Sequence, residues 1–190
     1  MFGAGSSNPE FLTALDNRLL FRATDAAGDV ELWASDGTAA GTTRIKNINP
    51  SGSSIPQQLI RFGAHVYFAA NDGSNGNELW RSDGSAAGTV LFANLLAGNG
   101  SSNPSGFRVF HNRLLFTATT GVGAEPWVSD GTLAGTQLLR DINPAGSSSA
   151  IFNGDVLGDQ LFFRASDGAG NQLWRTDGTP AGTVLHSVIN

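Results

Sequence analysis

The chain has 190 residues, of which 40% are hydrophobic and 14% charged, and its formal net charge is −5. This composition is too apolar for a disordered chain, no apolar run approaches the roughly 18 residues of a membrane helix, and the acidic balance argues against nucleic acid, whose phosphates are bound by clustered Lys and Arg. Because the chain contains no cysteine, disulfides, thiolate zinc sites and Cys nucleophiles are excluded.

A tandem repeat dominates the sequence, because its four tryptophans recur every 47 residues. Each Trp follows Glu-Leu or a similar pair and precedes a Ser-Asp-Gly-Thr-like turn and then Ala-Gly-Thr. We assign the repeats to residues 3–49, 50–96, 97–143 and 144–190 of a single domain, 1–190. The recurring residues that we single out are Trp33, Trp80, Trp127, Trp174, Asp36, Asp83, Asp130, Asp177, Gly37, Gly84, Gly131 and Gly178.

Four short apolar segments predict four strands in each repeat. In the first repeat they cover residues 11–15, 18–24, 31–35 and 42–48, which is the usual length of a strand. Two turn residues separate the first two segments, as in tight hairpins whose turns need positive φ. No segment has the apolar spacing of a helix. Each repeat therefore predicts an antiparallel four-stranded meander.

The second strand indicates how these sheets pack. It carries three consecutive apolar residues, Leu19-Leu20-Phe21 in the first repeat, and successive side chains of a strand point to opposite faces. Both faces of each sheet therefore need cover, which the preceding and following repeats can provide. Four-stranded sheets stacked in this way form a β-propeller. We predict an all-β propeller of four blades, either a four-bladed ring or half of an eight-bladed homodimer.

The string Glu-Leu-Trp-x-Ser-Asp-Gly-Thr-x-Ala-Gly-Thr, clearest at residues 31–42 and 78–89, resembles the ELWxxDGT repeat of bacterial proteins. The resemblance covers nearly the whole chain and implies a propeller-like, secreted or surface-associated protein with no catalytic or binding residue assigned to the repeat. The Met-Phe start has no signal-peptide character, so export would depend on a segment outside this sequence. Two copies depart from the motif, with Pro126 in place of Leu and Gln172 in place of Glu. Because Pro donates no ladder hydrogen bond, we expect the third strand of the third repeat to start late or to bulge.

The recurring side chains have a structural and a functional interpretation. The tryptophans could form aromatic platforms for sugars, but we favour wedges packed between blades, with each indole N–H bonded to a neighbour. The recurring Asp could bind a cation or ligand, but we favour an Asx turn that fixes the bend.

One loop resembles a calcium loop in its alternating oxygen ligands. Asp72, Asn75 and Asn77 are the weak candidates, and the equivalent loop of the third repeat has no carboxylate. A loop held by its own Gly and Asn residues is the alternative that we favour. We expect no other cofactor.

The catalytic inventory is small. His65, His111 and His186 occupy different phases of the repeat, and no esterase or phosphate-binding string is present. We therefore expect no catalytic residue and no enzyme, but a module for binding, adhesion or display with a carbohydrate or protein ligand, or a self-assembling scaffold. The alternative is a hydrolase or lyase with its site at the central channel, which requires a non-symmetric group of charged residues there.

Overall fold

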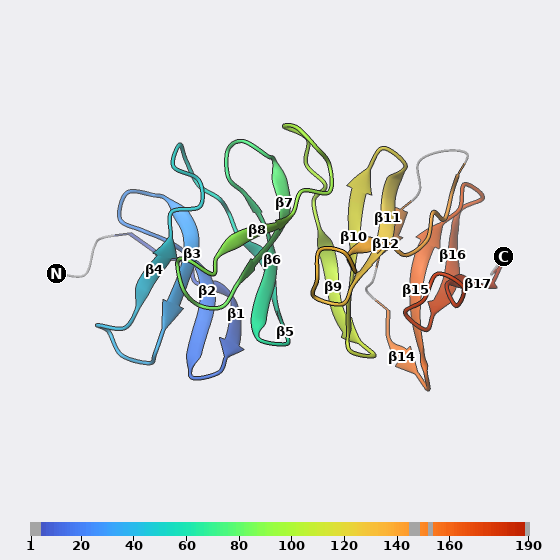
Figure 1. Ribbon diagram of the computed structural model, residues 1–190, viewed down its shortest axis with the longest axis horizontal. Helices are drawn as coiled ribbons and strands as arrows, with labels where there is room; N and C mark the ends of the chain where they lie inside the picture. Colours follow the sequence, from blue (N-terminus) through green and yellow to red (C-terminus); the bar gives the residue numbers. More distant parts are fainter. Residues whose placement is uncertain (1–4, 145–148, 152–153, 189–190) are drawn as a thin grey trace. The chain divides into compact units, whose positions relative to one another are not determined.

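The computed structural model describes residues 5–144, 149–151 and 154–188. These residues form strands, turns and loops without any helix, which confirms the all-β prediction (Figure 1). None of the described residues belongs to a helix that could cross a membrane.

Two antiparallel sheets of four strands contain the first two repeats, in the orders β1-β2-β3-β4 and β5-β6-β7-β8. In each, neighbours in sequence are neighbours in the sheet, as a meander requires. The strands are β1 (Glu10–Leu15), β2 (Arg18–Thr24), β3 (Val30–Ser35), β4 (Thr43–Lys46), β5 (Gln57–Phe62), β6 (His65–Asn71), β7 (Asn77–Ser82) and β8 (Val90–Ala93).

The last two repeats have the same strand order, but one parallel bridge between Ala124 and Ser149 joins their sheets. The first strand of the fourth repeat is divided in two. The strands are β9 (Ser105–Phe110), β10 (Arg113–Thr120), β11 (Gly123–Ser129), β12 (Gln137–Leu138), β13 (Ser149–Ile151), β14 (Val156–Leu157), β15 (Gln160–Ser166), β16 (Asn171–Thr176) and β17 (Val184–Ser187).

The chain divides into two compact units, residues 1–101 and 102–190, and each unit holds two repeats. In the first unit, a buried cluster joins Leu20 and Leu32 of the first repeat to Phe68 and Trp80 of the second. Burying a side chain of this size contributes about 1.5–3 kcal/mol. The second strand thus contributes apolar residues to the contact within the unit, from one face in the first repeat and from the opposite face in the second.

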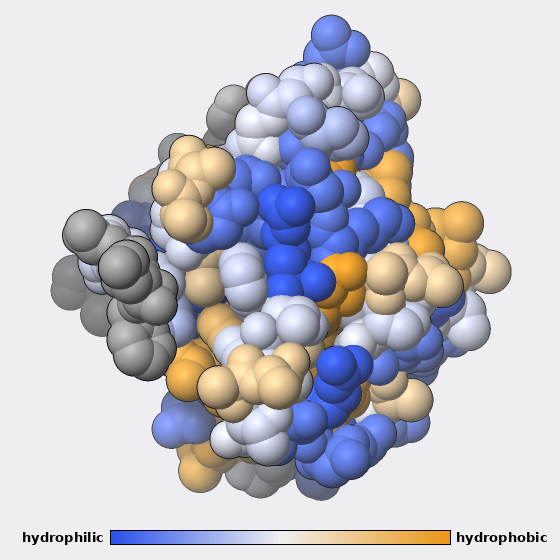
Figure 2. Space-filling view, turned by 90° about the vertical axis from the view of Figure 1, so that its left-hand side faces the viewer, coloured by the Kyte–Doolittle hydropathy of each residue, from blue (hydrophilic) through white to orange (hydrophobic). Residues whose placement is uncertain are grey.

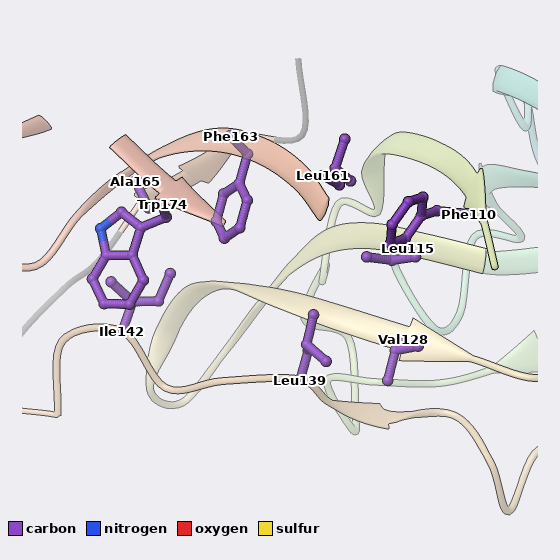
Figure 3. Packing of buried hydrophobic residues seen from close by; sticks show 9 residues of the cluster. All are labelled: Phe110, Leu115, Val128, Leu139, Ile142, Leu161, Phe163, Ala165 and Trp174. Atoms are coloured by element: carbon purple, nitrogen blue, oxygen red, sulfur yellow. The ribbon is translucent and has the colours of Figure 1, made fainter. Parts of the chain in front are cut away.

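The second unit repeats this packing (Figure 3). One buried cluster joins Phe163 and Trp174 of the fourth repeat to Leu115, Val128 and Leu139 of the third, in positions equivalent to those in the first unit. Two independent pairs of repeats therefore use the same face-to-face contact.

In the first three repeats, the first strand contains a bulge where its register against the second strand shifts. Phe11, Gln58 and Gly106 occupy equivalent positions in this bulge, and all three have positive φ, of 56°, 54° and 65°. A left-handed backbone at a non-glycine residue is rare, and only the third repeat has the glycine that favours it. The sequence pattern gave no sign of this bulge.

The expectation for Pro126 was wrong. The strand β11 begins at Gly123 and pairs with β10 without a shift, and Pro126 lies opposite Thr117. The Pro126 carbonyl accepts the Leu139 N–H (2.8 Å), so this bond to the following segment does not use the N–H that proline lacks. The effect appears instead in the next strand, because β12 has only two residues where β4 and β8 have four.

Candidate functional site

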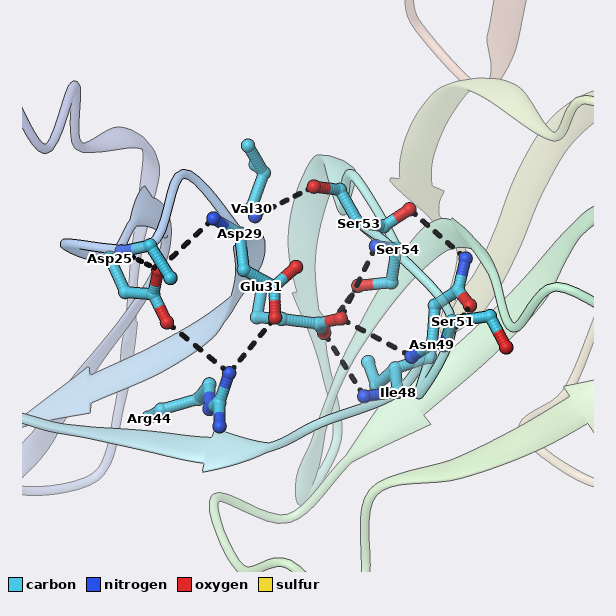
Figure 4. Close-up of polar contacts among 11 residues, drawn as sticks. Asp25, Asp29, Val30, Glu31, Arg44, Ile48, Asn49, Ser51, Ser53 and Ser54 are labelled. Carbon is cyan, nitrogen blue, oxygen red and sulfur yellow. Dashed lines mark hydrogen bonds and ion pairs between the residues drawn. The ribbon is translucent and has the colours of Figure 1, made fainter.

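A buried carboxylate fixes the linker between the first and second repeats (Figure 4). Glu31, at the start of β3, is fully buried. Its carboxylate accepts the N–H groups of Ile48 (3.1 Å), Asn49 (3.2 Å) and Ser54 (3.3 Å), and the Ser54 hydroxyl at 2.5 Å. Burial raises the pKa of Glu31, and these hydrogen bonds oppose that effect. The Glu of the motif is thus the anchor of the linker.

The same anchor recurs in the next two repeats. Glu78 accepts the Leu95 N–H at 2.8 Å, and Glu125 accepts the Ile142 N–H at 3.0 Å. Burial raises the pKa of Glu125 to about 7, and the charge of Asp141 adds to this effect. The motif Glu therefore has a structural role that the sequence analysis missed. Its signal was available, because a Glu that recurs beside a buried Leu-Trp pair on a strand needs buried partners.

Beside this anchor, the loop between β2 and β3 carries a charged cluster. The Asp25 Oδ1 atom accepts the N–H groups of Ala27 (2.8 Å) and Asp29 (3.0 Å), and these bonds, the one from Asp29 above all, lower the pKa of Asp25. The Arg44 guanidinium reaches from β4 to Asp25 (3.4 Å) and Asp29 (3.0 Å). The cluster fixes the loop against the outer strand.

A hollow of about 220 Å³ opens where this loop meets the linker. Its polar lining includes Asp29, Asn47, Asn49 and Ser53. The Oδ1 atom of Asp29 is buried and has no hydrogen-bond partner among the described residues. Carboxylate, amide and hydroxyl groups around a small hollow are suited to a ligand rich in hydroxyl groups, because they both donate and accept hydrogen bonds.

The recurring Asp lies in an Asx turn in all four repeats. In the first, the Asp36 Oδ1 atom accepts the N–H (2.9 Å) and the hydroxyl (2.7 Å) of Thr38, and the Thr38 hydroxyl accepts the Gly41 N–H (2.9 Å). Thr42 donates to the Thr38 carbonyl at 2.7 Å. Gly37 next to the Asp has a φ of +92°. The equivalent carboxylates, in the same bonds, are Asp83, Asp130 and Asp177, and the equivalent positive-φ glycines are Gly84, Gly131 and Gly178.

Two of the tryptophans lie between the repeats of a unit, but the indole N–H groups of all four differ from the expectation. Trp80 and Trp174 belong to the two buried clusters. The indole N–H groups of Trp33, Trp80, Trp127 and Trp174 have no hydrogen-bond partner in the part of the chain that the structure describes, so the predicted hydrogen bond to a neighbour was wrong. The rings of Trp80 and Trp174 pack in clusters of apolar side chains, which bring no acceptor with them.

The calcium candidates lie in a loop that bonds to itself. The Asp72 Oδ1 atom accepts the N–H groups of Ser74 and Asn75, both at 2.8 Å, and its Oδ2 atom accepts the Asn75 side-chain amide at 2.7 Å. The Asn77 N–H donates to the Ser101 hydroxyl at 3.0 Å. Within the described residues, no three His, Cys, Asp or Glu side chains are grouped as metal ligands. The candidate oxygens hold the loop together.

Two carboxylates in one pocket with different pKa values would be needed for hydrolysis. Asp29 and Glu31 come near to this arrangement, because the charge of Asp29 contributes to the raised pKa of Glu31. Glu31, however, is fully buried and bonded to backbone N–H groups, so a substrate cannot reach it without displacing the linker. The arrangement favours binding at the hollow over proton transfer.

No family model and no curated protein matches the chain. The resemblance to the ELWxxDGT repeat therefore stays a prediction. Among solved structures, puromycin hydrolase matches with a TM-score of 0.60 and 12% identity, over 97% of this chain and 29% of that chain. A puromycin-hydrolyzing peptidase of Mycobacterium tuberculosis matches with a TM-score of 0.55 and 10% identity, over 99% and 30%. Oligopeptidase B of Leishmania major matches with a TM-score of 0.52 and 15% identity, over 95% and 27%.

The matched parts of these peptidases are their propeller domains. The chain has the β-propeller fold. At 10–15% identity the likeness shows the fold alone, and this propeller spans only 27–30% of the peptidase chains. The predicted propeller of four-stranded antiparallel repeats is confirmed.

Proposed function

We propose that this propeller is a non-catalytic binding module that takes a hydroxyl-rich ligand, a carbohydrate in the first instance, at the rim formed by its inter-repeat linkers. The observation that carries the proposal is the buried, unpartnered Oδ1 atom of Asp29 beside the polar hollow. The Asp29 side chain is partly exposed, so a small movement of its loop brings the Oδ1 atom to a ligand hydroxyl, with which it forms a strong hydrogen bond. In line with the sequence resemblance, we place the module at a bacterial surface.

The fold supports this proposal through the rigidity of the rim. The Glu31 carboxylate holds the linker from one side, and the cluster of Asp25, Asp29 and Arg44 holds the facing loop. Loops fixed by a scaffold lose little entropy when a ligand binds. The recurring Asp residues do not compete for this role, because their turns use the carboxylates internally.

A glycan array followed by calorimetry on the strongest glycan tests the proposal. We expect Asp29→Asn and Asn47→Ala to weaken binding by about tenfold or more, because the first replaces a charged acceptor with a neutral amide and the second removes a hydrogen-bonding group. The matched control is Asp16→Asn, at a hairpin turn, where the carboxylate pairs with Arg61 at 2.8 Å. Binding unaffected by the first two variants, no glycan retained, or turnover of peptide or glycoside substrates would contradict the proposal.

A further inference from the structure

The linkers that precede the first three repeats share one backbone form. In each, a serine carbonyl accepts an N–H group from the second strand of the repeat that follows, at 2.6–3.0 Å; these serines are Ser7, Ser54 and Ser102. The next residue has positive φ in each linker, at Asn8, Ile55 and Asn103. The three linkers are therefore equivalent, position by position.

The second linker is built around the carboxylate of Glu31 (Figure 4). Ser54 donates its N–H (3.3 Å) and its hydroxyl (2.5 Å) to that carboxylate. The Ser53 hydroxyl accepts the Val30 N–H at 2.9 Å, and Ser54 is only 1% exposed. This form of the linker thus presents a pair of donors, from one serine, that binds a carboxylate.

The first and third linkers have the same sequence, Ser-Ser-Asn-Pro, at residues 6–9 and 101–104. In the third linker Ser102 is fully buried, and the Ser101 hydroxyl accepts the Asn77 N–H at 3.0 Å. In the first linker the same residues are exposed, and no described residue bonds to the N–H or the hydroxyl of Ser7. The first linker therefore has, on its surface, the donors that Ser54 gives to a carboxylate.

The first linker keeps its form without such a partner. The Thr24 N–H holds the Ser7 carbonyl at 2.8 Å, and the Ser6 hydroxyl donates to the Asn8 side-chain oxygen at 2.7 Å. Donors that are already in place lose little entropy when a ligand binds.

A hollow of about 510 Å³ opens at these donors, which is an ordinary size for a small-molecule pocket. Its lining includes Ser7, Thr24 and the partly exposed Trp33. An aromatic side chain offers apolar contact to a sugar ring, and the hydroxyl groups offer hydrogen bonds. Figure 2 looks onto this end of the first unit, where hydrophobic areas lie among hydrophilic residues.

The loop between β2 and β3 borders both this hollow and the hollow at Asp29, and Gly28 lines both. Asp25 also lines the larger hollow, but its charge is compensated by the Arg44 guanidinium at 3.4 Å, which pairs with Asp29 at 3.0 Å as well. Neighbouring sugars of one oligosaccharide can therefore occupy the two hollows, with an acidic sugar at the larger one.

We propose that the first linker binds the carboxylate of a uronic acid, which makes the ligand of this module an acidic carbohydrate. The N–H and the hydroxyl of Ser7 take this carboxylate as Ser54 takes that of Glu31, and Trp33 packs against the sugar ring. This inference rests on the proposed function, because the neighbouring sugars of the same glycan occupy the hollow at Asp29.

Trigalacturonic acid and its methyl ester are the matched probes, because the ester keeps the rings and hydroxyl groups and removes the negative charges. Calorimetry at about pH 7, where the acid is ionised, measures the affinity of each. We expect the acid to bind about tenfold or more tightly than the ester, since hydrogen bonds to a charged acceptor are about twice as strong as neutral ones.

Two variants of Ser7 locate the carboxylate. Ser7→Ala removes one donor and Ser7→Asp adds a like charge, and both replace an exposed side chain, so the fold is kept, which circular dichroism checks. We expect Ser7→Ala to weaken binding of the acid by about fivefold or more and Ser7→Asp to weaken it further, with little change for the ester. Ser74→Ala and Ser74→Asp are the controls, because Ser74 is exposed in the loop between β6 and β7 and lines neither hollow.

Equal binding of the acid and the ester, or equal losses for both ligands in the Ser7 variants, would overturn this inference. Tighter binding of a peptide with the sequence of residues 77–82, Asn-Glu-Leu-Trp-Arg-Ser, would also overturn it, because the first linker would then take a protein strand. If these results come with binding of the ester that Asp29→Asn weakens, the proposed function stands without this inference. If no glycan binds, both fall.

Discussion

The linker anchor yields the sharpest prediction, the loss of stability when Glu31 is replaced. Its carboxylate accepts three backbone N–H groups, at 3.1–3.3 Å, and one hydroxyl at 2.5 Å, all in a buried site. Glu31→Ala leaves these donors without an acceptor, and an unsatisfied buried donor costs about 1 kcal/mol or more. A water molecule can enter the space and recover part of this loss. We expect the free energy of unfolding to fall by about 3–5 kcal/mol, as for other broken buried charge networks.

Glu31→Gln separates the hydrogen bonds from the volume of the side chain. It keeps one acceptor oxygen and places an NH₂ group against donors, so we expect a loss of about 1–2 kcal/mol. Urea unfolding followed by tryptophan fluorescence measures the free energy of unfolding of both Glu31 variants. Hydrogen exchange of the Ile48, Asn49 and Ser54 amides shows where the structure is loosened. Glu10→Ala is the control, because Glu10 is half-exposed and its ion pair with Arg22 contributes less than about 1 kcal/mol. A loss below about 1 kcal/mol for Glu31→Ala, or unchanged exchange at the linker, would refute the reasoning.

Three further predictions follow from the same network of buried and turn groups. A side chain at Gly41 would lie 2.0–2.2 Å from the Asp36 carboxylate, so we expect Gly41→Ala and Asp36→Ala each to lower the free energy of unfolding by about 1–2 kcal/mol. The double variant should lose no more than either single variant, and a double-mutant cycle in urea measures this. The pKa of Glu125 is raised from 4.5 to about 7, so the folded chain binds more protons between these values and stability falls as pH rises through them. The free energy of unfolding falls by at most about 1.4 kcal/mol per pH unit. We expect urea unfolding from pH 5 to 8 to show this fall in the wild type and not in Glu125→Gln. Calcium at about 1 mM leaves the melting temperature unchanged, because the Asp72 oxygens already accept N–H groups; a clear rise that Asp72→Asn abolishes would contradict this.

The sequence was sufficient for the architecture because periodicity carries it directly. The recurrence of Trp33 and its equivalents gave the repeat length, and the apolar run at Leu19-Leu20-Phe21 predicted cover on both faces of a sheet. Both inferences depend only on which residues are apolar and how far apart they are, and the buried clusters confirm that the two repeats of a unit cover one another. The turn at Asp36 was equally readable, since an Asx turn uses atoms only two residues apart.

The candidate site was harder to predict because its partners are far apart in sequence. Glu31 bonds to Ile48 and Ser54, which are 17 and 23 residues away, and no local rule relates them. The hollow at Asp29 depends in the same way on how the linker returns to the loop. The bulge at Phe11 is a third case, because nothing in its side chain announces a positive φ. Contacts that are made only after the sheets have stacked leave little trace in local sequence.

The departures from repetition say more about function than the repetition itself. A residue that recurs in equivalent surroundings has the same role in each repeat. For the Asp of the turn and the Glu of the anchor, that role is hydrogen bonding within the repeat and its linker. Asp29 does not recur, since glycines (Gly76 and Gly170) take its place directly before the strand residues equivalent to Val30. Asp29 is also one of the residues that line the hollow. A recognition surface needs groups whose atoms are left for a partner, so the search for a ligand should begin at the positions where the four repeats differ.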